Sequence, residues 1–146
     1  MEIDRNSFIL GMINCFAEMV ACGVKTLALS PPLLPEDHET IGPLSDEIVR
    51  EFEIYSYLEK SLLVTKLQSP EFTRGKWSIL YFREEKTLIR YLALKEKKDE
   101  LEKSGKLNDR LLDEISRDLM FLLSYPETVI RNKLSGGKDP YLPPGL

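Results

Sequence analysis

Short hydrophobic runs with abrupt polar stops dominate the first 60 residues. One run covers residues 24–29 and stops at Ser30, before two prolines, and a second covers residues 54–58 and stops at Glu59. Runs of this length, bounded by proline or charged residues, are typical of β-strands. A strand, a helical crossover and a second strand normally lie parallel in one sheet. The pattern therefore predicts a β-α-β unit whose two strands end at the same edge.

The hydrophobic pattern predicts further elements of this sheet. Residues 35–42 and 45–52 are predicted as two separate helical pieces of the crossover, since Pro43 should break a single helix. Alternation of large apolar residues over 77–82 predicts a central strand. An apolar run at 62–65 would add a fourth strand, although the turn before it lacks the Asn-Gly chemistry of a tight hairpin. The expected sheet is mixed and has three or four strands.

Apolar spacings of three and four predict an N-terminal helix. Asp4 or Asn6 can cap its start, and Gly23 is suited to the left-handed position that follows a helix. One face should be buried, because its apolar residues recur once per turn. These residues are Ile9, Met12, Ile13, Phe16, Met19 and Val20.

Three more helices are predicted after residue 84. They cover residues 84–104, about 108–123 and about 127–134, and the spacing from Ser124 to Glu127 fits a capping box at the start of the last one. The chain is thus predicted to be an α+β protein with the N-terminal and three C-terminal helices on one face of the sheet and the crossover helix on the other.

Composition bounds the number of domains. With 146 residues, of which 42% are hydrophobic, the chain can form one domain with a real core. We expect this domain to cover residues 1–135 and to be followed by a Gly/Pro-rich tail, residues 136–146. Tyr141 and Leu142 are the natural anchors of that tail.

The cysteines and the single histidine indicate the chemistry to expect. Cys15 and Cys22 lie in one predicted helix, about 10 Å apart along its axis, which is too far for a disulfide between them. They are therefore expected to be reduced core thiols. Without a Cys/His cluster, the sequence predicts no metal and no cofactor. It also lacks an apolar stretch long enough to span a membrane, so a cytoplasmic setting is expected.

Charge is distributed unevenly along the chain. The net charge is −4, yet residues 1–59 carry −8 and residues 60–91 carry +4. The overall acidity argues against a dedicated nucleic-acid binder. The local positive excess leaves a small anion as a plausible ligand.

The strongest candidate catalytic group is Ser30 with Glu59 and Lys60, because ligands of open α/β sheets bind beyond the carboxyl ends of parallel strands. Glu59 could serve as a base, Lys60 as an electrophile and Ser30 as a hydrogen-bond donor. The alternative is that Ser30 caps the backbone and Glu59-Lys60 is an exposed hairpin tip. His38 lies between two carboxylates and invites an acid/base role, but a solvated loop histidine is the plainer interpretation.

A second candidate site is the loop at residues 73–77. Arg74 and Lys76 lie beside Gly75 and Trp77, which could bind an anion or stack a base, although the spaced glycines of a phosphate-binding fingerprint are missing. The alternative is that both cations remain in water.

Three classes of function follow from these patterns. The first is a non-catalytic cytoplasmic module that binds a partner protein or a small ligand, with a homodimer formed through the N-terminal helix or the C-terminal tail. The second is a small-molecule enzyme centred on Ser30, Glu59 and Lys60. The third is an anion or nucleotide binder that uses Arg74 and Lys76.

Overall fold

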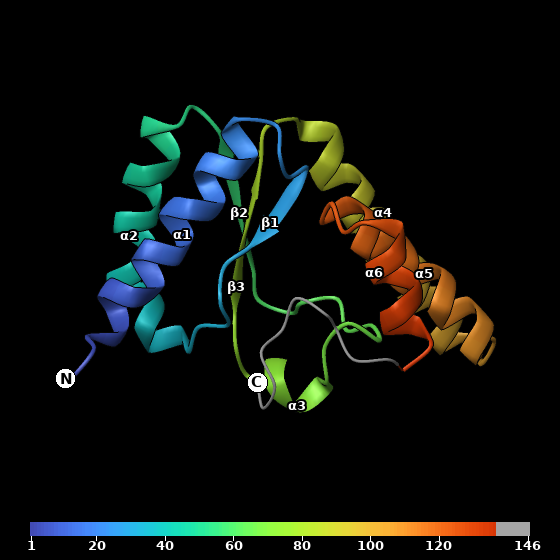
Figure 1. Cartoon of the computed structure of the whole chain (residues 1–146). Helices are drawn as coiled ribbons and strands as arrows, with labels where there is room; N and C mark the ends of the chain where they lie inside the picture. The colour runs from blue at the N-terminus through green and yellow to red at the C-terminus, as the bar shows by residue number, and fades with distance from the viewer. Residues whose placement is uncertain (137–146) are drawn as a thin grey trace.

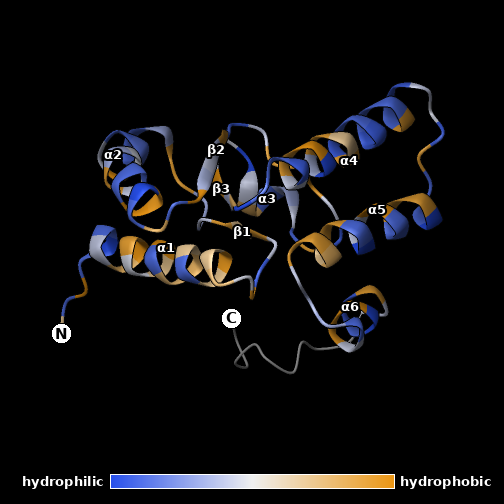
Figure 2. Cartoon of the chain, turned by 90° about the horizontal axis from the view of Figure 1, so that it is seen from above, coloured by the Kyte–Doolittle hydropathy of each residue, from blue (hydrophilic) through white to orange (hydrophobic). Residues whose placement is uncertain are grey.

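A three-stranded antiparallel sheet forms the centre of the protein. The computed structural model describes residues 1–136, in which β1 (Leu27–Leu29), β2 (Tyr55–Glu59) and β3 (Ser78–Phe82) lie in the order β1-β3-β2. Figure 2 shows β3 between the other two strands. Both outer strands pair antiparallel with β3. The fold is therefore α+β, as predicted, but the expected mixed sheet with a parallel pair of neighbours is wrong.

The central position of β3 explains this correction. All five of its residues are buried, so β3 is the strand that gains most from a neighbour on each side. Strands β1 and β2 do run in the same direction, yet β3 separates them. The predicted shared edge of two adjacent parallel strands therefore does not exist.

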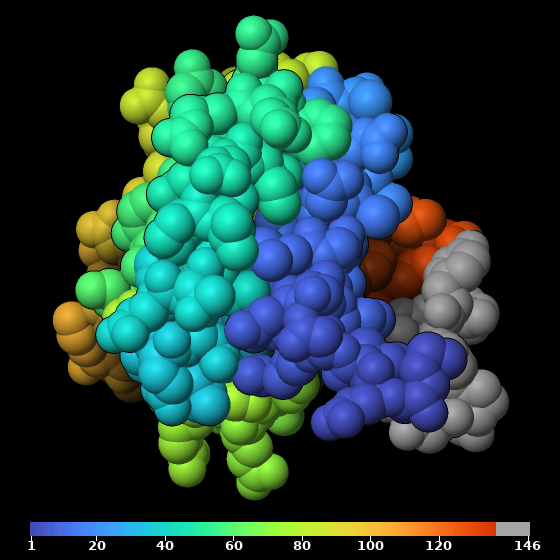
Figure 3. All heavy atoms as spheres, turned by 90° about the vertical axis from the view of Figure 1, so that its left-hand side faces the viewer, coloured from blue at the N-terminus to red at the C-terminus, as the bar shows by residue number. Residues whose placement is uncertain are grey.

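Helices cover both faces of the sheet, and the molecule has three layers (Figure 1). Helices α1 (Arg5–Ala21) and α2 (Pro35–Glu51) pack together on one face, where their outer sides form a continuous surface (Figure 3). Helices α4 (Glu85–Lys103) and α5 (Asp109–Leu122) cover the other face, and α6 (Glu127–Leu134) packs on α5. The prediction that α1 shares a face with the C-terminal helices is wrong. The alternation within β3 sets this division, because Ile79 and Tyr81 point to α1 and α2 while Leu80 and Phe82 point to the other face.

Helix α2 continues through Pro43, which corrects the prediction of two pieces. Proline removes one helical hydrogen bond, but tertiary contacts on both sides of it hold the helix together. Ile41 and Val49 are buried in the core, and the hydroxyl of Ser45 hydrogen-bonds to that of Tyr81 at 2.7 Å. Packing therefore outweighs the local preference to break.

Two helix ends match the prediction and one does not. Asp4 caps α1 by accepting a hydrogen bond from the amide of Ser7, and Gly23 follows with φ of +78°. The capping box before α6 is wrong, because Pro126 is the N-cap residue and makes no side-chain cap. The hydroxyl of Ser124 instead accepts a hydrogen bond from the amide of Thr26 at 2.9 Å. Ser124 thus ties the α5–α6 turn to the start of β1.

Cys15 and Cys22 are exposed free thiols, so the prediction of core thiols is wrong. The buried stripe of α1 consists of Ile9, Ile13, Ala17 and Val20. Cys15 lies two residues after Ile13, which places it on the opposite side of the helix.

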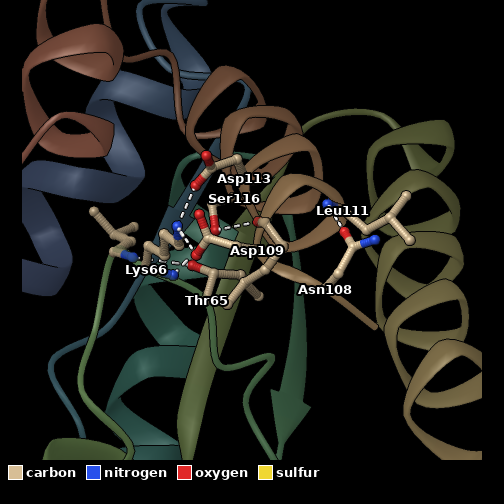
Figure 4. A network of polar contacts seen from close by, with 9 residues as sticks. Thr65, Lys66, Asn108, Asp109, Leu111, Asp113 and Ser116 are labelled. Carbon is tan, nitrogen blue, oxygen red and sulfur yellow. Dashed lines mark hydrogen bonds and ion pairs between the residues drawn. The ribbon is translucent and has the colours of Figure 1, made fainter. Parts of the chain in front are cut away.

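The apolar run at 62–65 forms an irregular segment and no strand. It leads to Lys66, whose amide donates to the hydroxyl of Ser116 at 3.0 Å and whose ammonium pairs with Asp109 at 2.6 Å and Asp113 at 2.5 Å (Figure 4). The two carboxylates raise the pKa of Lys66. This clamp fixes the segment onto α5 before the short helix α3 (Pro70–Thr73). The predicted tail anchors, Tyr141 and Leu142, lie outside the described residues.

No helix within residues 1–136 combines the length and the apolar character needed to cross a membrane.

Candidate functional site

Ser30 and Glu59 lie on opposite faces of the sheet. Ser30 follows β1 beside Ile79, whose side chain points to the α1–α2 face, whereas Glu59 pairs with Ser78 and points to the α4 face. The hydroxyl of Ser30 accepts a hydrogen bond from the amide of Ile79 and donates to the carbonyl of Pro31, each at 2.9 Å. Ser30 therefore satisfies backbone groups, and the structure does not bring the predicted pair together.

Glu59 is the centre of a buried polar network. It is only 2% exposed, and the ammonium of Lys95 lies 2.9 Å from each of its carboxylate oxygens. The hydroxyl of Tyr91 donates to Oε2 at 2.8 Å, and the amide of Ser61 donates to Oε1 at 2.9 Å. Tyr91 in turn accepts from the amide of Leu63, and burial raises the pKa of its hydroxyl. This network anchors the segment after β2 to α4.

His38 and Lys60 gather around Trp77. The His38 ring meets the Trp77 ring edge-on with centroids 5.7 Å apart, and the ammonium of Lys60 lies 4.7 Å from the same indole centroid. His38 belongs to α2, so it is not the loop histidine that we expected. Gly42 makes room for it, since a Cβ there would lie 2.8 Å from the imidazole.

Arg74 and Lys76 lie in the turn after α3. Arg74 is exposed, and the ammonium of Lys76 lies 5.4 Å from the ring centroid of Phe72. The structure therefore supplies Lys76 with an aromatic partner from its own loop and leaves Arg74 in solvent.

A basic pocket lies between the end of α1 and the first turns of α4, just after β3. Its volume is about 260 Å³. The polar side chains that line it, which define the basic pocket, belong to Lys25, Thr26, Arg83, Glu84, Lys86, Thr87 and Arg90.

The fold positions each cation of this pocket differently. Arg83 leaves β3 and donates to the carbonyl of Ala21 at 3.3 Å, so it closes the end of α1. Its guanidinium lies 3.5 Å from the place where a Cβ of Gly23 would stand. Lys86 pairs with Glu84 at 2.8 Å, which lowers the pKa of that carboxyl. Arg90, one turn further along α4, makes no ion pair within residues 1–136.

Lys25 closes the pocket toward the α5–α6 turn. Its ammonium donates to the carbonyl of Leu123 at 2.8 Å and lies 5.7 Å from the ring centroid of Tyr125. Burial lowers the pKa of Lys25. It adds positive charge to the pocket while serving as part of its wall.

Two groups at the start of α4 add hydrogen-bond donors. Thr87 is only 3% exposed and lines the pocket, yet its hydroxyl makes no hydrogen bond within the described part of the chain. Glu84, the N-cap residue, makes no side-chain cap, so the amides of Glu85 and Lys86 keep the unpaired positions of a helix start. Within residues 1–136, the pocket thus combines four cations, the hydroxyl of Thr87 and the positive end of a 19-residue helix with one carboxylate.

Only part of this pocket can be recognised in the sequence. The positive excess of residues 60–91 includes Arg83, Lys86 and Arg90, and these cations follow a predicted strand at the start of a predicted helix. A strand end that leads into a helix is a recurrent place for anion binding. Nothing local marked Lys25 or Thr87, because the fold alone brings residue 25 to residues 83–90.

Comparisons of the chain with models of protein families, with curated proteins and with solved structures found no match. The function is therefore argued from the site itself.

Proposed function

We propose that the protein is a non-catalytic module that binds a small phosphate-type anion in the basic pocket. One observation carries the proposal: four cationic side chains and the hydroxyl of Thr87 line one small hollow at an uncapped helix start, in a chain whose net charge is −4. Phosphate offers oxygens in several directions, and guanidinium groups, hydroxyls and helix amides are its usual donors.

The size of the pocket limits the ligand. At about 260 Å³ it lies just below the range of pockets that enclose drug-sized molecules. A phosphate with a short organic group suits this volume better than a nucleotide. The acidity of the rest of the chain disfavours a nucleic acid.

The proposal assigns no reaction. Among residues 1–136, Glu84 is the one carboxylate that lines the pocket, and its pairing with Lys86 lowers its pKa, which makes it a poor proton acceptor. The exposed free thiols of Cys15 and Cys22 suit a reducing compartment such as the cytoplasm.

Calorimetric titration with inorganic phosphate and with glycerol phosphate tests the proposal. Arg90→Gln removes an exposed cation that has no carboxylate partner within residues 1–136, and we expect about tenfold weaker binding, the equivalent of one charge-assisted contact. Arg74→Gln changes the net charge equally, far from the pocket lining, and should leave affinity within about twofold. Equal losses in both variants, or no binding by the native protein, would refute the site.

Thr87→Val provides a second probe, because it keeps the shape of the side chain and removes the hydroxyl. Native stability should not fall, since this hydroxyl makes no hydrogen bond within residues 1–136. Phosphate affinity should fall by about tenfold, because a donor to the anion is lost.

A further inference from the structure

The two edges of the sheet are protected very differently. Strand β1 has three residues and is followed by Ser30 and two prolines, which prevent further pairing at that edge. Strand β2 has five residues, contains neither proline nor lysine, and pairs with β3 in an unbroken register without a bulge. Natural sheets rarely leave an edge of this length without such protection. The outer edge of β2 is therefore a candidate interface.

The hydrogen-bond pattern identifies which backbone groups face outward. On β3, Ile79 bonds toward the β1 side, since its carbonyl accepts from the amide of Ser30. Neighbouring residues of a strand bond to opposite sides, so Ser78, Leu80 and Phe82 bond toward β2. Their partners in β2 are Glu59, Tyr57 and Tyr55.

The amides and carbonyls of Ser56 and Leu58 therefore point away from the sheet, since they alternate with residues that bond inward.

Apolar side chains flank this edge. Tyr55 is 59% exposed and stacks on Phe82, and it lines a hollow of about 480 Å³ together with Leu88 of α4. One residue further along α4, Ile89 is 61% exposed. Leu92 is also exposed and lines the next hollow with the segment after β2. An open edge and an apolar flank thus lie side by side.

We propose that the outer edge of β2 pairs with the same edge of a second copy of this chain. An antiparallel register centred on Tyr57 sets Ser56 opposite Leu58 of the second copy. This register pairs all four outward backbone groups of each copy, and a shift by one residue in either direction would leave some of them unpaired. It joins the two sheets into one of six antiparallel strands.

The same symmetry brings complementary side chains together. A two-fold axis through Tyr57 places the two Tyr57 rings beside each other, and aromatic cross-strand pairs are favourable. In this register Lys60 of each copy comes opposite Ile54 of the other. Both α4 helices lie on one face of the joined sheet, where Ile89 of each copy can be covered. These features favour a second copy over an unrelated peptide.

Hydrogen exchange of the full-length protein at low and high concentration tests the proposal. The amides of Ser56 and Leu58 should exchange at least tenfold more slowly at high concentration, whereas that of Tyr57, already bonded to β3, should change little. Light scattering should show twice the mass of the 16.8 kDa chain. A monomer at every concentration, or a dimer that protects the amides of Leu27 and Leu29 or no strand amide, would overturn it.

Two variants separate edge pairing from loss of folding. Ser56→Pro removes only an outward amide and should raise the dissociation constant at least tenfold, with the circular dichroism spectrum unchanged. Ile89→Ser should weaken the dimer as well. The control is Phe121→Ser on α5, which removes a side chain that is equally exposed, at 62%, and should leave the dimer intact. Equal effects of the two serine variants would refute the interface. Phosphate binding is measured in a separate experiment, so the dimer and the anion site are tested independently.

Discussion

Replacing Glu59 with glutamine should destabilise the protein although the two side chains have the same shape. The carboxylate receives donors at both oxygens: Ser61 and Lys95 at Oε1, and Tyr91 and Lys95 at Oε2. An amide has only one oxygen, so its NH₂ group must face at least one of these donors in either orientation. The variant also leaves the Lys95 ammonium without a counter-charge.

The structure sets the size of this effect. Breaking a buried ion pair by removing one charge costs about 3–5 kcal/mol. The Lys95 side chain is 32% exposed, so water partly screens its unpaired charge and the cost should lie lower, at about 2–3 kcal/mol. A double variant with Lys95→Met should cost less than the sum of the single variants, because the two groups interact directly.

Urea unfolding measures this free energy, with an unchanged m-value showing that the native state stays compact. The control is Glu114→Gln, which removes the partner of Arg110 from an exposed pair at 3.3 Å and should cost less than about 0.5 kcal/mol. Should Glu59→Gln cost no more than the control, the network would not anchor the segment after β2. Glu59 would then be free for another role.

Two further predictions concern α2 and the basic pocket. Gly42→Ala should destabilise the protein by about 1–3 kcal/mol, despite the better helix propensity of alanine, because the new Cβ meets the imidazole of His38. In a His38→Ala background the same change should stabilise the protein. Urea unfolding measures both changes, and a Gly42→Ala variant that destabilises both backgrounds would contradict this reasoning. Lys86→Met should raise the pKa of Glu84, measured by carbon NMR, toward the ordinary 4.5. Since the folded pKa lies below the unfolded value, Glu84 stabilises the native state above pH 4.5 and loses this contribution as pH falls through its folded pKa. A Glu84 pKa that does not change in the Lys86→Met variant would contradict the pairing with Lys86.

Element positions follow from local patterns, and their assembly does not. The alternation over 77–82 located β3 correctly, and the helical spacing located α1, α4 and α5 correctly. The predicted strand order was wrong because it depends on which strand occupies the centre of the sheet. Ile79 of β3 lies 49 residues beyond Ser30, to which it hydrogen-bonds. No local rule represents that competition. Likewise, Pro43 is a strong local breaker that burial of its neighbours overrides.

The candidate site shows the same limit. A positive segment after a predicted strand already contained Arg83, Lys86 and Arg90, so part of the anion site was visible as charge. The sequence placed the anion at Arg74 and Lys76 instead, because glycine and tryptophan made that loop look like a binding platform. Burial of Thr87 and the approach of Lys25 are properties of the fold, and they distinguish a pocket from a charged surface.

The most direct test of the basic pocket is an NMR titration of the labelled protein with inorganic phosphate. The account predicts the largest amide shifts at Glu85, Lys86 and Thr87, the first turn of α4, with saturation and with little change at residues 73–77. Shifts centred on residues 73–77, or no saturable shift at any residue, would contradict it.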